Sequence, residues 1–321
     1  MVIISGTGFG TRSAYNTHSN SGLAWAWRDF DEGAVDGFGF SHGLDSSGND
    51  NWDAIAGTYG GCFNRHARSI YWARRAAKGG GNDNVGGLKK GNGNVNGLIY
   101  ASWWQFLPTN SNSGKFYRHR TDSPEDDFWM SWGGNSSPPY QVYRTSDSDS
   151  GPMNPISNWA FGPVPIDIWF RIELLFEGSG ASVRQRSWIT GQNSNNRLYD
   201  DAVTLDILPI YEANMGAGKD PPLSTSNFWG YDDIYIDFTQ ARVELADAST
   251  WAARTKSEIQ IPTVWSATSI SVNVNQASYA NGSTAYLYVI DSAGLVNASG
   301  FLVTVGSGVS VPAAPSNLRL I

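Results

Sequence analysis

The fold class is decided by the stretch Ile168-Trp-Phe-Arg-Ile-Glu-Leu-Leu-Phe176. Apolar residues recur at every second position from Ile168 to Phe176, and the intervening positions begin with Trp169, Arg171 and Glu173. Successive side chains of a β-strand point to opposite faces, so this pattern predicts a strand that is buried on one face only. The other face carries Trp, Arg and Glu rather than Ser, Thr and Lys. That composition favours contact with a ligand over simple solvation.

The same strand character recurs along the chain, separated by Gly-, Asn- and Ser-rich turns. Short runs of this kind at such spacing predict an antiparallel β-sandwich. The fold class is therefore all-β, with a large antiparallel β-sandwich and, near the C-terminus, a run of short strands small enough for an Ig-like β-sandwich. The further runs are Leu98–Leu107, Lys115–Arg120, Phe128–Trp132, Tyr140–Arg144, Ala181–Ile189 and Tyr231–Asp237.

Composition agrees with this class and excludes several functions. The 321 residues include 36 Gly and 14 each of Trp, Tyr and Phe, which is typical of a turn-rich, aromatic-rich β protein large enough for two domains. The net charge of −7 argues against nucleic acid as a partner. A single cysteine, Cys62, excludes an internal disulfide framework and a Cys-based metal cage.

The chain contains no 18-residue apolar run, so no membrane span is predicted. The start Met1–Ser5 is too short and uncharged for a signal peptide, which predicts a trimmed mature form or another export route. An aromatic-rich β protein with this composition is expected outside the cell, or on the surface of a cell or particle.

Both ends of the chain resemble one family. The runs Ser269–Val274, Thr284–Ile290 and Phe301–Val305 are similar to the later strands of the IPT/TIG-type Ig-like domain, and Ile3–Thr11 resembles its opening strand followed by Gly-x-x-Phe-Gly. The resemblance implies one Ig-like domain with a large insertion, which costs little when the ends of the interrupted loop lie close together. The predicted parts are a first Ig-like strand in 1–22, a jelly roll in 23–239, the remaining Ig-like strands in 240–310 and a proline-containing tail in 311–321.

The insertion resembles the concanavalin A-like jelly roll of lectins, laminin G modules, glucanases and polysaccharide lyases. Tyr100–Trp104, Trp169–Glu173 and Tyr231–Asp237 look like the central and closing strands of that fold. The likeness is one of fold, and this fold carries many functions.

Non-catalytic recognition of a polysaccharide or glycan is the function that we predict first. Flat rings offer apolar area to a sugar face, while charged groups bind its hydroxyls. The alternative is that the inserted loops or the Ig-like part cover this face and make it a second core. The predicted ligand-binding residues are Trp169, Arg171, Glu173, Arg184, Arg186 and Trp188.

Two other functions stay open. A polysaccharide lyase acting on an acidic glycan would need a base and a cation, for which Tyr117, His119 and Arg68 are the candidates. The paired-carboxylate segment Glu-x-Asp-x-x-Glu of jelly-roll glucanases does not occur. A structural subunit of an envelope, filament or virion exterior is the third hypothesis, with the aromatic faces as contacts for self-assembly or attachment.

Structural calcium is the one cofactor that the sequence suggests. Asp45, Asn49, Asp50 and Asp53 supply hard oxygen ligands in one loop, although the EF-hand spacing is missing. Asp232 with Asp233, and the segment Thr145–Asp149, are alternative positions.

Overall fold

The structure, a computed structural model, describes 16 segments of the chain. Side chains are described chiefly in 1–12, 97–106, 167–178 and 232–306, and at Tyr117; the other strands are described by their backbone. The described segments are 1–12, 26–28, 54–56, 71–73, 87–95, 97–106, 114–121, 126–133, 141–148, 160–161, 167–179, 182–191, 197–203, 210–215, 229–306 and 318–319.

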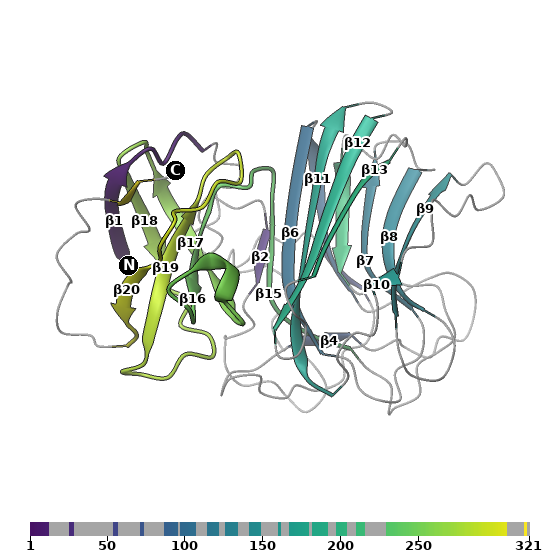
Figure 1. Cartoon of the computed structure of the whole chain (residues 1–321). Helices are drawn as coiled ribbons and strands as arrows, with labels where there is room; N and C mark the ends of the chain where they lie inside the picture. The colour runs from purple at the N-terminus through teal and green to yellow at the C-terminus, as the bar shows by residue number, and fades with distance from the viewer. Residues whose placement is uncertain are drawn as a thin grey trace.

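Three sheets lie side by side in Figure 1, and we call them the terminal, middle and distal sheets. The terminal sheet contains both ends of the described chain, because β1 (Val2–Thr7) pairs in parallel with the last strand, β21 (Leu318–Arg319). On its other side, β1 pairs antiparallel with β18 (Ser269–Asn273) through Val2↔Val272 to Ser5↔Ser269. Its strand order is β20 (Phe301–Thr304), β19 (Thr284–Ile290), β16 (Arg242–Ala246), β17 (Ser257–Trp265), β18 (Ser269–Asn273), β1 (Val2–Thr7) and β21 (Leu318–Arg319).

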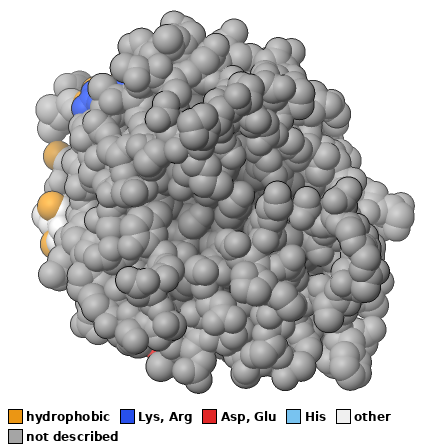
Figure 2. Space-filling view, turned by 90° about the vertical axis from the view of Figure 1, so that its right-hand side faces the viewer, with side chains coloured by type: hydrophobic (Ala, Val, Ile, Leu, Met, Phe, Trp, Pro, Cys, Tyr) orange, Lys and Arg blue, Asp and Glu red, His pale blue; other side chains and the backbone are white. Residues whose placement is uncertain are grey.

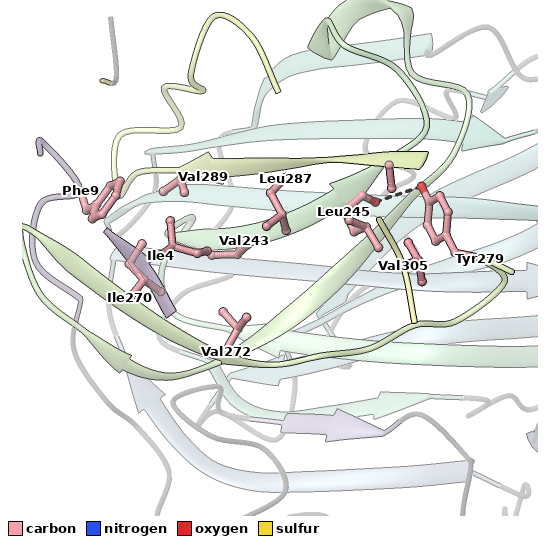
Figure 3. Close-up of a cluster of buried hydrophobic side chains, with 11 residues drawn as sticks. Ile4, Phe9, Val243, Leu245, Ile270, Val272, Tyr279, Leu287, Val289 and Val305 are labelled. Atoms are coloured by element: carbon pink, nitrogen blue, oxygen red, sulfur yellow. Dashed lines mark hydrogen bonds between the residues drawn. The ribbon is translucent and has the colours of Figure 1, made fainter. Parts of the chain in front are cut away.

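The terminal sheet curls around a core of its own, shown in Figure 3. Alternate residues of its strands point inward, as the burial of Val243, Leu245, Ile270 and Val272 shows. The hydroxyl of Tyr279 closes one end of this core by donating to the carbonyl of Leu245 at 3.2 Å. One 3₁₀ turn, η1 (Trp251–Ala253), follows β16.

The middle sheet is built around β11, which pairs antiparallel with β12 on one side and β6 on the other. The apolar face predicted for this strand is confirmed, since Phe170, Ile172, Leu174 and Phe176 are all 0% exposed. The strand order is β13 (Arg197–Val203), β12 (Ser182–Gly191), β11 (Trp169–Ser179), β6 (Gly97–Phe106), β15 (Trp229–Asp237) and β2 (Ala26–Arg28), with β4 (Tyr71–Ala73) also paired to β15.

The distal sheet lies on the far side of the middle sheet from the terminal sheet (Figure 1). A contact between the two sheets of this sandwich joins Trp103 of β6 and Tyr117 of β7, whose rings stack with their centroids 5.3 Å apart. The strand order is β10 (Ala160–Phe161), β9 (Gln141–Ser148), β8 (Asp126–Gly133), β7 (Gly114–Thr121), β14 (Ile210–Met215), β5 (Gly87–Val95) and β3 (Ala54–Ala56).

The prediction of an all-β protein with an antiparallel jelly-roll sandwich is confirmed. Within the described segments, no helix is long and apolar enough to cross a membrane. The terminal sheet forms the second, smaller β unit. Its assignment to the IPT/TIG family and the predicted domain boundaries stay predictions.

Candidate functional site

The face of the middle sheet that was predicted to bind a ligand meets the terminal sheet. Strand alternation places Arg171 and Glu173 of β11 on this face, and Trp104 and Ser102 of β6 lie directly opposite them in register. Both charged residues are only 2% exposed. They are buried because β16 and β17 of the terminal sheet contact this face, as the following hydrogen bonds show.

Arg171 joins the two sheets. Its Nη1 donates to Oε2 of Glu244 at 2.6 Å and to Oγ of Ser257 at 2.6 Å, both on the terminal sheet. Its Nε donates to Oγ of Ser102 at 2.7 Å, on the neighbouring strand of the middle sheet. Its Nη2 donates to Oε1 of Glu244 at 3.2 Å and to the hydroxyl of Tyr100 at 3.1 Å.

A second arginine makes the interface electrically balanced. Arg242 of β16 donates from Nε to Oε1 of Glu244 at 2.6 Å, lies 3.4 Å from Oε1 of Glu173, and stacks over the ring of Tyr100 at 4.2 Å. The hydroxyl of Tyr100 donates to Oε1 of Glu173 at 2.6 Å. Two guanidinium groups and two carboxylates therefore share one buried network, which we call the interface network (Arg171, Glu173, Arg242 and Glu244).

The pKa of Glu244 shows which influence dominates in this network. Burial alone would raise the pKa of this carboxyl group, but the charges of Arg171 and Arg242 lower it well below its ordinary range. The carboxylate form of Glu244 is thus the stable one at neutral pH. The pKa of the Tyr100 hydroxyl is raised, chiefly by burial, so this phenol remains protonated.

Apolar and aromatic side chains complete the seal between the sheets. Tyr100, Leu175 and Tyr235 of the middle sheet form a buried cluster with Ile259 and Ile261 of the terminal sheet. Trp104 also lies in the interface, where its Nε1 donates to Oε2 of Glu258 at 2.8 Å. The prediction that Arg171 and Glu173 stand on an exposed platform is wrong, because the alternative weighed for this face, coverage by another part of the chain, is what the structure shows.

The other four predicted ligand-binding residues lie toward the rim of this face. Trp169 is half-buried beside Phe106, and Trp188 is half-buried against the apolar interface cluster. Arg186 forms an ion pair with Glu177 and lies over the Trp188 ring, with its guanidinium carbon 5.9 Å from the ring centroid. Arg184 is exposed. These four residues do not form a continuous platform with Arg171 and Glu173.

A second link between the sheets was not foreseen. Arg12, which follows β1, forms an ion pair with Asp237 at the end of β15 and donates to the hydroxyl of Tyr235 at 2.8 Å. Its Nε donates to the carbonyl of Ala241 at 2.9 Å. Burial raises the pKa of Asp237 to about 6, although Arg12 and the Tyr235 hydroxyl act in the opposite direction. No pattern around Arg12 in the sequence indicated this long-range contact.

Of the three lyase candidates, the structure describes the side chain of Tyr117 alone. Tyr117 is 0% exposed and stacks on Trp103 inside the sandwich, where burial raises the pKa of its hydroxyl. A group sealed in the core cannot take a proton from a polymer, so its assignment as a base is wrong. His119 lies two residues further along β7, and Arg68 lies outside the described residues.

The calcium prediction is untested at its main position, since Asp45, Asn49, Asp50 and Asp53 lie outside the described residues. Asp232 and Asp233 are buried, and Oδ1 of Asp233 accepts a hydrogen bond from Nδ2 of Asn275 at 3.0 Å. In the described segments, no three or more His, Cys, Asp or Glu side chains gather as metal ligands would.

The burial of Tyr117 fixes the orientation of the whole distal sheet. In the cross-strand register, Tyr117 lies in a row with apolar neighbours on four other strands, which we call the apolar row. Because Tyr117 points at the middle sheet, this row belongs to the core face. The apolar row consists of Ile55, Leu88, Met215, Tyr117 and Met130, and on β9 the register continues to the charged residue Arg144.

The row that lies one residue away from the apolar row on each strand has a different composition. Because successive side chains alternate between faces, it belongs to the opposite, outer face of the sheet. We call five of its members the polar row: Thr145, Trp129, Arg118, Asn214 and Lys89. The register continues from Lys89 to Ala54 of β3. Figure 2 views the molecule from the side of the distal sheet. The placement of the polar row on the outer face follows from the register of the strands with Tyr117. Sequence alternation in Lys115–Arg120 showed two faces, but only the Trp103–Tyr117 contact shows which one is outside.

No family model matches the chain, and no curated protein matches its sequence. Among solved structures, similar folds include the alginate lyase Aly36B in complex with alginate trisaccharide (10% identity, TM-score 0.43, 67% of this chain and 98% of that one). A second is the CBM2 module of the evolved Dit of Lactobacillus casei BL23 phage J-1 (11% identity, TM-score 0.35, 74% of this chain and 89% of that one). A third is the Bacillus licheniformis β-glucanase (11% identity, TM-score 0.36, 72% of this chain and 96% of that one). Likeness at these identities and scores does not define a shared activity.

Proposed function

We propose that this protein is a non-catalytic carbohydrate-binding protein of the extracellular space or of a cell or particle surface, and that it binds glycan on the outer face of the distal sheet. The observation that carries the proposal is the register of the distal sheet. It groups Trp129, Arg118 and Asn214 in one row on the face opposite the buried Tyr117.

The residue types in the polar row suit a sugar. An indole ring offers flat apolar area to the C–H face of a pyranose, while guanidinium and amide groups bind hydroxyls by hydrogen bonds. Neighbouring strands lie about 4.8 Å apart, so five strands give a row about 19 Å long. A surface of that length accommodates several linked sugars rather than a single one.

The non-catalytic part of the proposal is supported by the position of Tyr117. The lyase hypothesis needed its hydroxyl at the substrate, but the ring lies in the core against Trp103. The face of Arg171 and Glu173 does not supply a substitute site, because the terminal sheet covers it.

Binding of the purified full-length protein to a broad glycan array tests the proposal. We expect wild type to retain at least one glycan and Trp129→Ala to lose it, with thermal unfolding unchanged. Arg184→Ala, an exposed change on the middle sheet, is the matched control and should bind as wild type does. Tyr117→Phe should also bind normally, and no unsaturated uronate product should form on uronate polymers.

Two results would overturn the proposal. Wild type that binds no glycan but forms a large stable assembly in native mass measurements would favour the structural-subunit hypothesis. Ultraviolet absorbance of an unsaturated product that disappears in Tyr117→Phe would instead establish a lyase.

A further inference from the structure

We infer that the glycan bound by the distal sheet is a linear polysaccharide bearing carboxylate or sulfate groups at intervals of about 10 Å, aligned with the polar row. This inference rests on the proposed function and specifies its ligand. It is carried by the way in which charge is distributed over the rows of the outer face.

In the polar row and in the row beside it, every charged residue is a cation. The neighbouring row, which we call the end row, contains Tyr143, Ser131 and Lys115 in register. Lys115 pairs with Ser131 rather than sharing the face of Tyr117, because the register shifts by one residue between Lys115 and Tyr117. Together the two rows hold Lys115, Arg118 and Lys89 and no Asp or Glu. This local excess of positive charge occurs in a chain whose net charge is −7.

The row on the other side of the polar row has the opposite charge. We call it the carboxylate row, and it places three acidic residues around a single cation. An anionic polymer is repelled there and attracted to the polar and end rows, so the charges also position it on the sheet. The members of the carboxylate row are Asp147, Asp127, Arg120, Glu212 and Gly91.

The spacing of the cations selects the class of polymer. Arg118 of β7 and Lys89 of β5 are separated by one strand, β14, which puts their backbones about 10 Å apart. Duplex DNA carries a negative charge about every 1.7 Å, far more densely than two cations at this spacing can match. A sugar polymer with well-separated acidic groups fits the spacing better.

The side-chain types agree with an acidic sugar. The planar guanidinium of Arg118 matches a carboxylate or sulfate through paired hydrogen bonds, whereas the Lys89 ammonium acts as a point charge. Trp129 lies next to Arg118 in the same row and offers a surface for the uncharged face of a sugar ring. Uronates and sulfated sugars share the chemistry required.

The test compares three classes of polymer with the full-length protein: a neutral glucan, a uronate polymer and a sulfated polysaccharide. We expect at least one anionic polymer to bind about tenfold or more tightly than the neutral one, with affinity that falls as salt is raised. Arg118→Gln and Lys89→Gln should each weaken anionic binding by about tenfold and leave neutral binding unchanged. Arg184→Gln is the matched control, since it removes a charge from an exposed site on the middle sheet.

Each result has a separate meaning. Preference for the uronate or for the sulfated polymer identifies the source of the negative charge and supports the inference. Equal binding of neutral and anionic polymers, without salt dependence, overturns the inference but leaves the proposed function intact. Binding of no glycan at all overturns both. Anionic binding that Arg118→Gln and Lys89→Gln leave unchanged would place the ligand elsewhere and also overturn the inference.

Discussion

The two outward faces of the jelly-roll sandwich have similar composition but different surroundings. The face of the middle sheet presents Tyr100, Trp104, Arg171 and Glu173, and strands of the same chain cover it. The face of the distal sheet presents the polar row and lies on the side of the molecule away from the terminal sheet (Figure 1). Aromatic and charged residues at alternate positions therefore do not by themselves indicate a binding surface.

The difference lies in what the rest of the chain supplies. β16 has the sequence Arg-Val-Glu-Leu-Ala and alternates in the same way as β11. Its Arg242 and Glu244 provide the charges that complement Glu173 and Arg171. A polar strand face is buried without a large penalty only when such partners satisfy its charges.

The largest effect that we predict comes from breaking the interface network. Arg171→Ala should lower the free energy of unfolding by about 3–5 kcal/mol, because it leaves the Glu244 carboxylate buried with fewer partners. Urea unfolding followed by tryptophan fluorescence measures this change. Arg184→Ala, on an exposed site, should change stability by less than about 0.5 kcal/mol. A loss below about 1 kcal/mol for Arg171→Ala would mean that the face is not sealed.

Local patterns explain why the fold class could be predicted from the sequence. The alternation in Ile168–Phe176 is a property of one strand, and pleating alone places its even-numbered apolar residues on one face. The position of Arg171 depended instead on pairing with Glu244, 73 residues away, and that of Asp237 on Arg12, 225 residues away. Contacts at such separations leave no periodic pattern in the sequence.

The proposed site on the distal sheet was not among the predicted ligand-binding residues for a related reason. Tyr117 and Arg118 are adjacent, so one of them must face the core and the other must face outward. The sequence offered no basis for choosing, and Tyr117 was a candidate base only under the lyase alternative. The stacking of Tyr117 on Trp103 determines the choice, and that contact joins two sheets rather than two neighbours in sequence.

A second, intermediate effect distinguishes the two buried carboxylates by pH. The pKa of Glu244 is lowered from 4.5, so its contribution to stability is present above that pH and is lost as the pH falls below it. The pKa of Asp237 is raised from 3.8 to about 6, so the folded state favours its neutral form. Stability should therefore fall as the pH rises from about 4 to about 6, by at most about 3 kcal/mol.

The test is to measure the free energy of unfolding as a function of pH, from below pH 4.5 to above pH 6, in wild type and in Asp237→Asn. The variant should lose the decrease between pH 4 and pH 6 that Asp237 causes, while the loss of stability below pH 4.5 attributed to Glu244 should remain. Identical slopes in the two proteins would show that Arg12 holds the Asp237 carboxyl group ionised throughout.

The smallest effect concerns the ion pair between Arg186 and Glu177, at the rim of the same sheet face. Their side chains are 22% and 31% exposed, whereas those of Arg171 and Glu244 are 2% and 0% exposed. Water screens the rim pair, so a double-mutant cycle of Arg186→Ala and Glu177→Ala should give a coupling of about 0.2–1 kcal/mol. The same cycle on Arg171 and Glu244 should give a clearly larger value. Equal coupling in the two cycles would mean that water reaches both pairs alike, and the distinction between a sealed centre and an exposed rim would fail.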